Sequence, residues 1–310
     1  MEPPTPELSA IIASLGREAA VRDTVADLFL QEGDFPEILV VLQRPNEANA
    51  ATAELRAWHR EGRIRLLEPN FANAQRARNL GILAARAPIV MLLDDDIRAP
   101  ADLVARHLAN YRQDPSLDGV AGQVLEPGQA PTRELPPQHS WPHLGWQFFP
   151  LNFAERAPTV NWPSTNSSVR RMLAIEVGGF DARFERTWLD DTDFSCRLRA
   201  RGAKLVFDPS ATITHLKVRS GGRRIEARLD LWMDAEGWAT HFYFWRKNFG
   251  IWRARRAAAW NLRYLVFRKA VLLRPAWLAR NLAHVARGWR LATARLRAGP
   301  LYLNSKETSR

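Results

Sequence analysis

The chain has 310 residues, 46% of them hydrophobic, and this is enough to bury the core of one large α/β domain or of a domain with an appendage. Its single cysteine, Cys196, excludes an internal disulfide framework and fits a reducing compartment. The acidic, Pro-rich start MEPPTPELSA is unlike a secretory signal, and no window of about 18 apolar residues predicts a transmembrane helix. We therefore expect a cytoplasmic protein, peripheral at the inner face of the membrane.

The formal net charge of +11 is unevenly distributed. Residues 246–310 contain 16 Lys and Arg against one acid, Glu307, whereas the preceding 245 residues carry a net charge of −4. Such an asymmetry indicates a polyanionic partner for the basic end, either an anionic membrane face or a nucleic acid.

The first 127 residues alternate strand-like and helix-like segments. Helical spacing of Val21, Val25 and Leu28 predicts a helix over 17–31, and a second pattern with a proline in its first turn predicts one over 100–112. The apolar, partly β-branched segments predicted as strands are 8–14, 37–43, 64–69, 88–93 and 119–126. This alternation is typical of a doubly wound, mostly parallel sheet, in which ligands bind at the carboxyl ends of the strands.

The pattern then becomes less regular. Seven prolines between 127 and 158 predict a long functional loop over 128–160. The elements expected after it are two short strands in 159–171, a helix over 172–177, a turn at 178–181, a helix over 189–201 and two strands in 203–216. Residues 239–298 are expected to be helical, with one apolar stripe formed by Leu278, Leu282, Val285, Trp289, Ala292 and Leu296.

Three aspartates, Asp94, Asp95 and Asp96, directly follow the apolar segment 88–93. An isolated triplet of this kind is most simply a solvated turn or a helix start. At the rim of a buried sheet, however, it also suits Mg²⁺ or Mn²⁺, which prefer oxygen ligands and bind phosphate oxygens at the same time.

A second acidic group, Asp190, Asp191 and Asp193, lies at the start of the helix predicted over 189–201. Capping and the helix dipole account for one or two of these acids. Three acids beside Trp188 and Phe194 would be desolvated, which is typical of carboxylates that act as general bases. Both interpretations stay open at this point.

Four segments in order resemble the family 2 glycosyltransferases of the GT-A fold: 70–97, 166–181, 188–202 and 214–216. The resemblance implies a Rossmann-like GT-A domain over 1–238, with a nucleotide-sugar-binding half (1–127), an acceptor half (128–238) and a basic, Trp-rich helical tail (239–310). It also implies an inverting transfer of a sugar from a nucleoside-diphosphate sugar to a hydroxyl acceptor. Membrane attachment of the tail would suit a glycan or lipid-linked acceptor, in cell-surface polysaccharide or glycolipid synthesis. A divalent cation, Mn²⁺ or Mg²⁺, is the implied cofactor.

The resemblance also assigns roles to residues. Asp191, paired with Asp190, would be the catalytic base, and the metal would be held by Asp96, Asp94 and His215. The positions implied for the donor are Ser14, Arg17, Gln43, Arg78, Asn79, Asp94 and Asp95. Those implied for the sugar and acceptor are Asn166, Gly179, Asp181 and Trp188. Arg170, Arg171 and the basic segment 217–224 would close over the phosphates, the latter as a mobile lid or an ordinary surface loop.

Two segments depart from the family pattern. The opening segment reads SLGR at 14–17, and the second strand ends in VVLQRPNE at 40–47, where relatives carry carboxylates that recognise the base. The nucleobase is therefore open, and a uridine donor is only the default.

The stripe of the tail predicts an amphipathic anchor on anionic lipid, or else packing on the catalytic domain or on a second chain. Three other functions remain as alternatives: a nucleotidyltransferase on a related sheet, a catalytically inactive relative, and a nucleic-acid-binding protein that uses the tail. No zinc knuckle or helix-turn-helix signal supports specific nucleic-acid binding.

Overall fold

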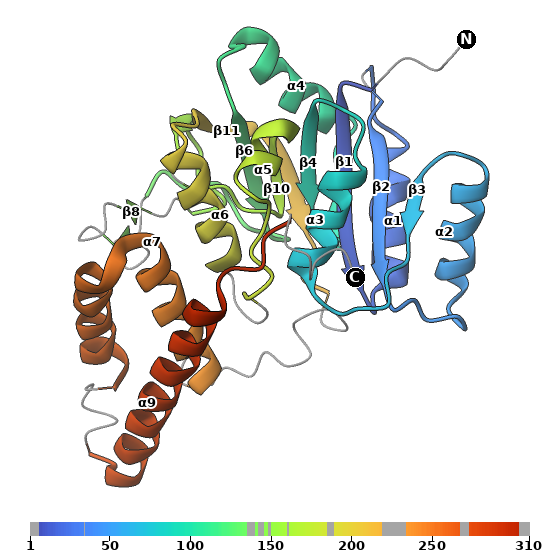
Figure 1. Ribbon diagram of the computed structural model, residues 1–310. Coiled ribbons are helices and arrows are strands. Elements are labelled where there is room, and N and C mark those ends of the chain that lie inside the picture. The colour runs from blue at the N-terminus through green and yellow to red at the C-terminus, as the bar shows by residue number, and fades with distance from the viewer. Residues whose placement is uncertain are drawn as a thin grey trace.

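A computed structural model describes residues 6–33, 35–134, 140–141, 146–147, 150–159, 161–184, 189–218, 234–266 and 273–303. Its centre is a nine-stranded sheet with the order β3-β2-β1-β4-β10-β6-β11-β5, in which β9 pairs with β11. Helices cover both faces of this sheet, and α7 and α9 form a separate helical pair beside it (Figure 1). The predicted α/β class with a mostly parallel sheet is confirmed.

Most strands of the sheet run parallel: β1 (Leu8–Leu15), β2 (Glu37–Gln43), β3 (Arg65–Leu67), β4 (Ile89–Leu93), β6 (Gly119–Leu125) and β11 (Leu205–His215). Three run antiparallel to their neighbours: β5 (Ile97–Arg98), β9 (Ala157–Pro158) and β10 (Asn166–Arg170). A small hairpin of β7 (Ser140–Trp141) and β8 (Trp146–Gln147) lies within the segment predicted as a loop.

The helices of the sheet domain are α1 (Glu18–Leu28), α2 (Ala50–Arg60), α3 (Ala74–Ala84), α4 (Leu103–Gln113), α5 (Arg171–Glu176) and α6 (Leu189–Ala200). On one face, α1 and α4 pack their apolar stripes on the sheet through residues such as Val25 and Leu108. On the other face, α3, α5 and α6 enclose a second cluster that includes Ile82 and Phe194. The sheet is therefore buried on both faces, as its continuous apolar strands predict.

Two sequence predictions are wrong in detail. The two strands expected in 203–216 are one strand, β11, whose register against β6 shifts between Asp208 and Thr212. A bulge there keeps the chain in the sheet where two strands were expected. The two strands expected in 159–171 reduce to β10, since Ser164 and Thr165 form a turn before it.

The C-terminal helices are α7 (Ala235–Asn261) and α9 (Pro275–Ala298), and a π-helix, η5 (Leu262–Val266), follows α7 directly. Gly250 has non-helical angles (φ 74°, ψ 171°) and divides α7 into two halves. At Gly288 a Cβ would lie 2.5 Å from the Cβ of Trp238, so the missing side chain permits the close approach of α9 to α7. No helix in the described ranges is long and apolar enough to span a membrane.

After α9 the chain returns to the sheet domain. Leu303 is buried in the cluster beneath α3, α5 and α6, and its N–H donates to the carbonyl oxygen of Gly178 over 2.7 Å. The N–H of Ala182 donates to the carbonyl oxygen of Leu301 over 2.9 Å. The described end of the tail is thus anchored on the turn at 178–181.

Candidate active site

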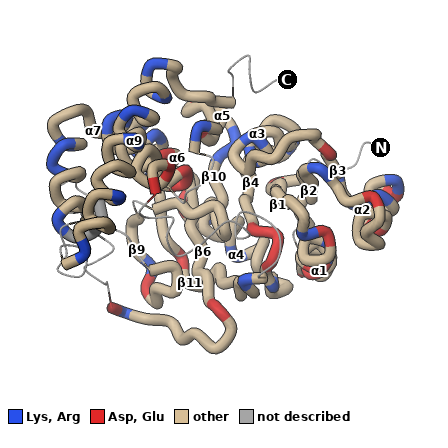
Figure 2. Tube along the Cα trace, turned by 90° about the horizontal axis from the view of Figure 1, so that it is seen from below, with Lys and Arg blue, Asp and Glu red and all other residues tan. Residues whose placement is uncertain are grey.

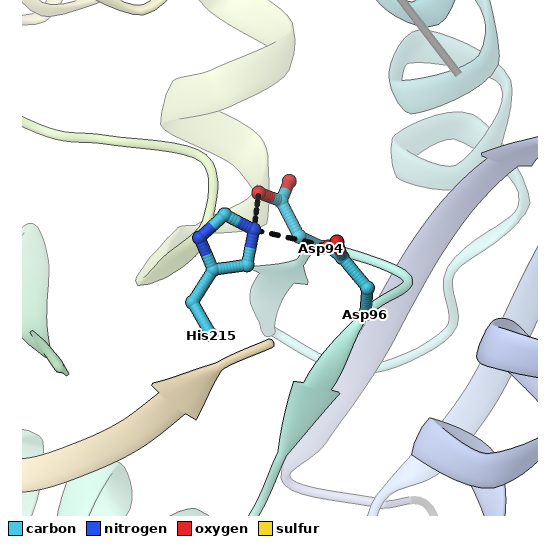
Figure 3. A group of neighbouring side chains, drawn as sticks. All are labelled: Asp94, Asp96 and His215. Atoms are coloured by element: carbon cyan, nitrogen blue, oxygen red, sulfur yellow. Dashed lines mark hydrogen bonds and ion pairs between the residues drawn. The ribbon is translucent and has the colours of Figure 1, made fainter. Parts of the chain in front are cut away.

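The carboxyl end of β4 carries the first acidic group. Asp94 and Asp96 extend from the turn after β4, and His215 reaches toward them from the end of β11 (Figure 3). The Nε2 atom of His215 lies 3.0 Å from Asp96 Oδ1 and 3.6 Å from Asp94 Oδ2, and one ligand atom from each of the three residues lies within 4.8 Å of the others. His215 and Asp96 are buried, whereas Asp94 is half-buried.

Asp95, between these two residues, is held by the end of β1 and by Arg17, which follows it. Ser14 Oγ donates to Asp95 Oδ2 over 2.6 Å, and the Arg17 guanidinium lies 3.0 Å from Asp95 Oδ1 and 3.4 Å from Asp96 Oδ2. Burial raises the pKa of Asp95 to about 6, although Ser14 and Arg17 oppose this rise. The unusual SLGR segment therefore supplies the positive charge that the aspartate triplet needs.

The second acidic group lies on the first turn of α6. Asp190 Oδ2 accepts from Gln75 Nε2 over 2.7 Å and from Arg78 over 2.9 Å, and both donors lie on α3. The same guanidinium of Arg78 lies 3.9 Å from Asp94 Oδ1. Arg78 thus joins the acids of β4 to the acids of α6, so the two groups that are distant in sequence meet at one place.

Asp191, next to Asp190, is half-buried, yet its Oδ1 atom is buried and has no hydrogen-bond partner among the described residues. Burial and the neighbouring Asp190 raise the pKa of Asp191 to about 7, against the effects of Arg78 and of hydrogen bonds from Ser164. A carboxylate with an oxygen free of hydrogen bonds to the described residues and a pKa near neutrality can take up a proton at physiological pH.

Asn79 and Gly179 contact each other at the turn before α6. Asn79 Nδ2 donates to the carbonyl oxygen of Phe180 over 2.8 Å, and Asn79 Oδ1 accepts from the N–H of Phe180 over 2.7 Å. Gly179 has φ +63°, and a Cβ there would lie 2.3 Å from Asn79 Oδ1. Both residues therefore fix the turn before α6, and their donor and acceptor roles stay predictions.

Two further acids bind the C-terminal helices. Asp181 and Asp193 have fully buried side chains, and Lys247 Nζ of α7 lies 2.7 Å from each of them. Asp181 also accepts from Tyr243 Oη over 2.7 Å, and Asp193 from Asn248 Nδ2 over 2.9 Å. Burial alone would raise the pKa of Asp193, but Lys247 and Arg197 hold it below its usual value.

The remaining predicted positions differ in their surroundings. Asn166 is buried, donates to the carbonyl oxygens of Gln123 and Ala211, and lies 3.1 Å from His107 Nε2. Gln43, at the end of β2, bonds the backbone of Ser14 and Asn73. Trp188 lies outside the described residues, and so does most of the predicted lid at 217–224, of which 217 and 218 are described.

The expectation that Arg170 and Arg171 contact the phosphates is wrong. Arg170 pairs in register with Ile89, at the opposite end of β4 from Asp94. Its guanidinium donates to the Leu117 carbonyl oxygen, and that of Arg171 donates to the carbonyl oxygens at the end of α3.

Sequence reasoning did not single out Gln75 or Lys247. Gln75 lies one helical turn before Arg78, so the 3.6-residue period of α3 is a signal that places it beside Asp190. Lys247 is separated from Asp193 by 54 residues and from Asp181 by 66, and no local pattern predicts these contacts.

Asp94, Asp96 and His215 form a set of donors that suits a divalent cation. Two carboxylates and an imidazole are ligands that Mn²⁺ accepts, and Mg²⁺ favours the carboxylates. The donors converge, and Val218 N–H and Arg17 orient the second oxygen of Asp96. The residues present therefore fit the implied cofactor.

Comparison with solved structures identifies the fold. The chain aligns with *S. aureus* TarS 1–349 in complex with UDP-GlcNAc at a TM-score of 0.62 and 13% identity, covering 96% of this chain and 93% of that one. It aligns with the mannosyltransferase PcManGT from Pyrobaculum calidifontis, in complex with GDP-Man and Mn²⁺, at a TM-score of 0.54 and 14% identity, covering 94% and 88%. At these identities the likeness shows the fold, which is that of the GT-A glycosyltransferases.

The sequence profile described as glycosyl transferase family 2 matches residues 9–178, and the chain belongs to this family. Among curated proteins of Mycobacterium tuberculosis, a pre-mycofactocin glycosyltransferase is 30% identical over 153 residues, or 48% of this chain. An N-acetylglucosaminyl-diphospho-decaprenol L-rhamnosyltransferase is 35% identical over 95 residues, or 31% of this chain. The matched stretches span only 31% and 29% of these relatives' own lengths.

Proposed function

We propose that the protein is a metal-dependent, inverting glycosyltransferase that moves a sugar from a nucleoside-diphosphate sugar to a hydroxyl group of an acceptor. The observation that carries this proposal is the position of Arg78, whose guanidinium contacts both Asp94 and Asp190. It brings the cation-binding group and the candidate base, Asp191, to one place at the carboxyl edge of the sheet.

In the proposed reaction, Asp191 accepts the proton of the acceptor hydroxyl as the hydroxyl oxygen bonds to the anomeric carbon. The bond between that carbon and the diphosphate oxygen breaks on the opposite face, and the nucleoside diphosphate leaves with the bonding electrons. A positioned general base typically contributes about 10²–10⁴-fold in rate. The pKa of about 7 suits this task, because near neutral pH a large share of the carboxylate is ionised and still basic.

Asp94, Asp96 and His215 would hold the divalent cation, which supplies Lewis-acid stabilisation of the diphosphate when it is bound. Arg78 donates to Asp190 Oδ2 over 2.9 Å, beside Asp191, and ties the first turn of α6 to α3. Arg17 and Ser14 hold Asp95, and Gln43 orders the loop next to it, where the donor base would lie. The nucleobase is open, with uridine as the default.

A lipid-linked glycan is the proposed class of acceptor, in cell-surface polysaccharide or glycolipid synthesis. One relative's name describes transfer to an N-acetylglucosaminyl-diphospho-decaprenol, which supports this class without identifying the sugar. Asp94 and Asp190 are both present and both contact Arg78, which supports an active enzyme over an inactive relative. Family membership takes precedence over the nucleotidyltransferase alternative.

The test is a thermal-shift panel of nucleoside diphosphates with and without Mn²⁺, on the wild-type chain, Asp96→Asn and Asp191→Asn. We expect one nucleotide to raise the melting temperature of the wild type and of Asp191→Asn only when Mn²⁺ is present, and Asp96→Asn to lose that shift. Transfer from the matching sugar nucleotide should require the wild-type Asp191. The proposal is wrong if no nucleotide gives a shift with Mn²⁺, or if Asp191→Asn transfers sugar normally.

A further inference from the structure

The C-terminal helical pair exposes an unusual share of large apolar side chains. Half of the twelve exposed large hydrophobic residues in the described ranges lie on it or in the turn before α9: Ile251, Trp252, Trp260, Leu273, Trp277 and Leu282. Trp252 and Leu273 are each 73% exposed. Exposed apolar clusters of this kind mark an interaction site and are not needed to form the core.

These residues are not the stripe that the sequence predicted as an anchor. Leu278, Val285, Trp289 and Leu296 pack against the cluster around Trp238 and Phe242 of α7, and Ala292 is buried there. Only Leu282 of the stripe is substantially exposed. The stripe therefore joins the two helices to each other, and a different surface is left for a partner.

The second half of α7 has one buried face and one exposed face. Ala254, Ala257 and Ala258 are buried, whereas Trp252, Arg256 and Trp260 recur at helical spacing on the exposed face. This half of α7 and the first turns of α9 lie on the side of the molecule away from the sheet (Figure 1).

This exposed face is strongly basic. The sequence holds no acidic residue between Glu236 and Glu307, and Figure 2 shows Lys and Arg distributed along α7 and α9. The guanidinium of Arg255 lies 5.0 Å from the ring centroid of Trp252, and those of Arg274 and Arg280 lie 5.2 and 5.0 Å from that of Trp277. Trp252 thus has one arginine beside its ring, and Trp277 has two.

We infer that this face, formed by the exposed residues of 251–263 and 273–282, docks on an anionic lipid bilayer. Tryptophan rings suit the boundary between headgroups and acyl chains, and arginines beside them attract anionic headgroups. A nucleic acid would use the arginines but gain little from the exposed aliphatic residues Ile251, Leu273 and Leu282. The inference deepens the proposed function, since it would place a lipid-linked acceptor near the enzyme, but docking itself does not rest on that function.

The test is flotation of the full chain with phosphatidylcholine vesicles, with and without phosphatidylglycerol. We expect binding only when phosphatidylglycerol is present. Removing three charges with Arg253→Gln, Arg255→Gln and Arg256→Gln should weaken binding roughly 100-fold, at about five-fold for each arginine. Trp252→Ala with Trp277→Ala should also weaken it, at unchanged charge. The matched control replaces Arg86, Arg133 and Arg201, which are exposed on the sheet domain, by Gln.

The control carries the same net charge as the first variant, so docking through this face predicts that it binds vesicles nearly as well as the wild type. Equal loss in both charge variants, or no binding to phosphatidylglycerol, overturns the inference. So does vesicle binding that the tryptophan variant leaves unchanged, or a preference for single-stranded DNA over vesicles in competition. The thermal shift with nucleotide and Mn²⁺ is measured on every variant, because it separates loss of docking from loss of the folded donor site.

Discussion

Replacing Lys247 by methionine removes the ammonium group that lies between two buried carboxylates. Lys247 Nζ lies 2.7 Å from Asp181 and 2.7 Å from Asp193; its side chain is 10% exposed and theirs are 0% exposed. Methionine keeps most of the apolar stem, so the variant tests the charge and leaves the packing largely intact. Because α7 supplies the lysine and the sheet domain supplies both acids, the substitution weakens the attachment of the C-terminal helices.

The cost follows from the partners that remain. Removing one member of a buried ion pair typically costs about 3–5 kcal/mol, because it leaves an uncompensated charge. Asp193 keeps Arg197 at 3.0 Å and Asn248 at 2.9 Å, and Asp181 keeps Tyr243 at 2.7 Å. We therefore expect the lower end of that range, a loss of about 3 kcal/mol in the free energy of unfolding.

Urea titration followed by tryptophan fluorescence measures this loss, since Trp238 and Trp245 are buried in the same helical pair. Lys204→Met is the matched control: Lys204 also contacts a carboxylate, Asp114, at 2.6 Å, but the two side chains are 57% and 37% exposed. That variant should unfold at almost the same urea concentration as the wild type. A loss below about 1 kcal/mol for Lys247→Met would refute the reasoning, because it would show that the buried pair contributes no more than a surface pair.

Three further predictions concern the site itself. The value of log kcat/KM should rise with pH up to about 7 and then level off. The reason is that burial raises the pKa of Asp191 to about 7, and the protonated carboxyl cannot act as a base. Asp191→Asn should lower kcat by about 10²–10⁴-fold without a comparable change in donor KM. His215→Ala should reduce the Mn²⁺-dependent thermal shift, whereas His59→Ala, on α2, should preserve it, and equal effects would contradict the metal assignment. Gly179→Ala should destabilise the fold more than Gly33→Ala does. Both glycines have positive φ, but of the two only Gly179 would place the added Cβ against another atom, 2.3 Å from Asn79 Oδ1. Chemical denaturation of the two variants measures the difference in the free energy of unfolding.

Local sequence signals were sufficient for the edge of the sheet. The apolar run 88–93 forms β4 and places Asp94 at its carboxyl end, because a continuous apolar segment of this length is buried on both faces. His215 ends β11, which pairs with β6 in the same sheet, and its place near the aspartates was predicted through the family resemblance. The prediction for Asp94 needed only the apolar run of the strand and the rule that ligands bind at strand ends.

Sequence signals were insufficient where the partner lies far away along the chain. An amphipathic stripe such as that of α9 has the same period whether it faces lipid or another helix, so its burial against α7 could not be predicted. In the same way, Asp181 and Asp193 are acidic residues of the kind expected in a site, yet both form ion pairs with Lys247. Some acidic residues near a site thus face it, whereas others attach neighbouring helices to the domain. Only tertiary contacts distinguish the two kinds.

The arrangement of charges explains how three adjacent aspartates are tolerated at the end of a buried strand. Arg17 lies against Asp95, Arg78 reaches Asp94, and His215 contacts Asp96, so each carboxylate has a cationic or hydrogen-bonding neighbour from a different element. The protein's own side chains therefore offset much of the repulsion among the three carboxylates. It follows that removal of divalent cations should leave the fold intact while it abolishes donor binding, and that the acids can be prepositioned before the donor arrives.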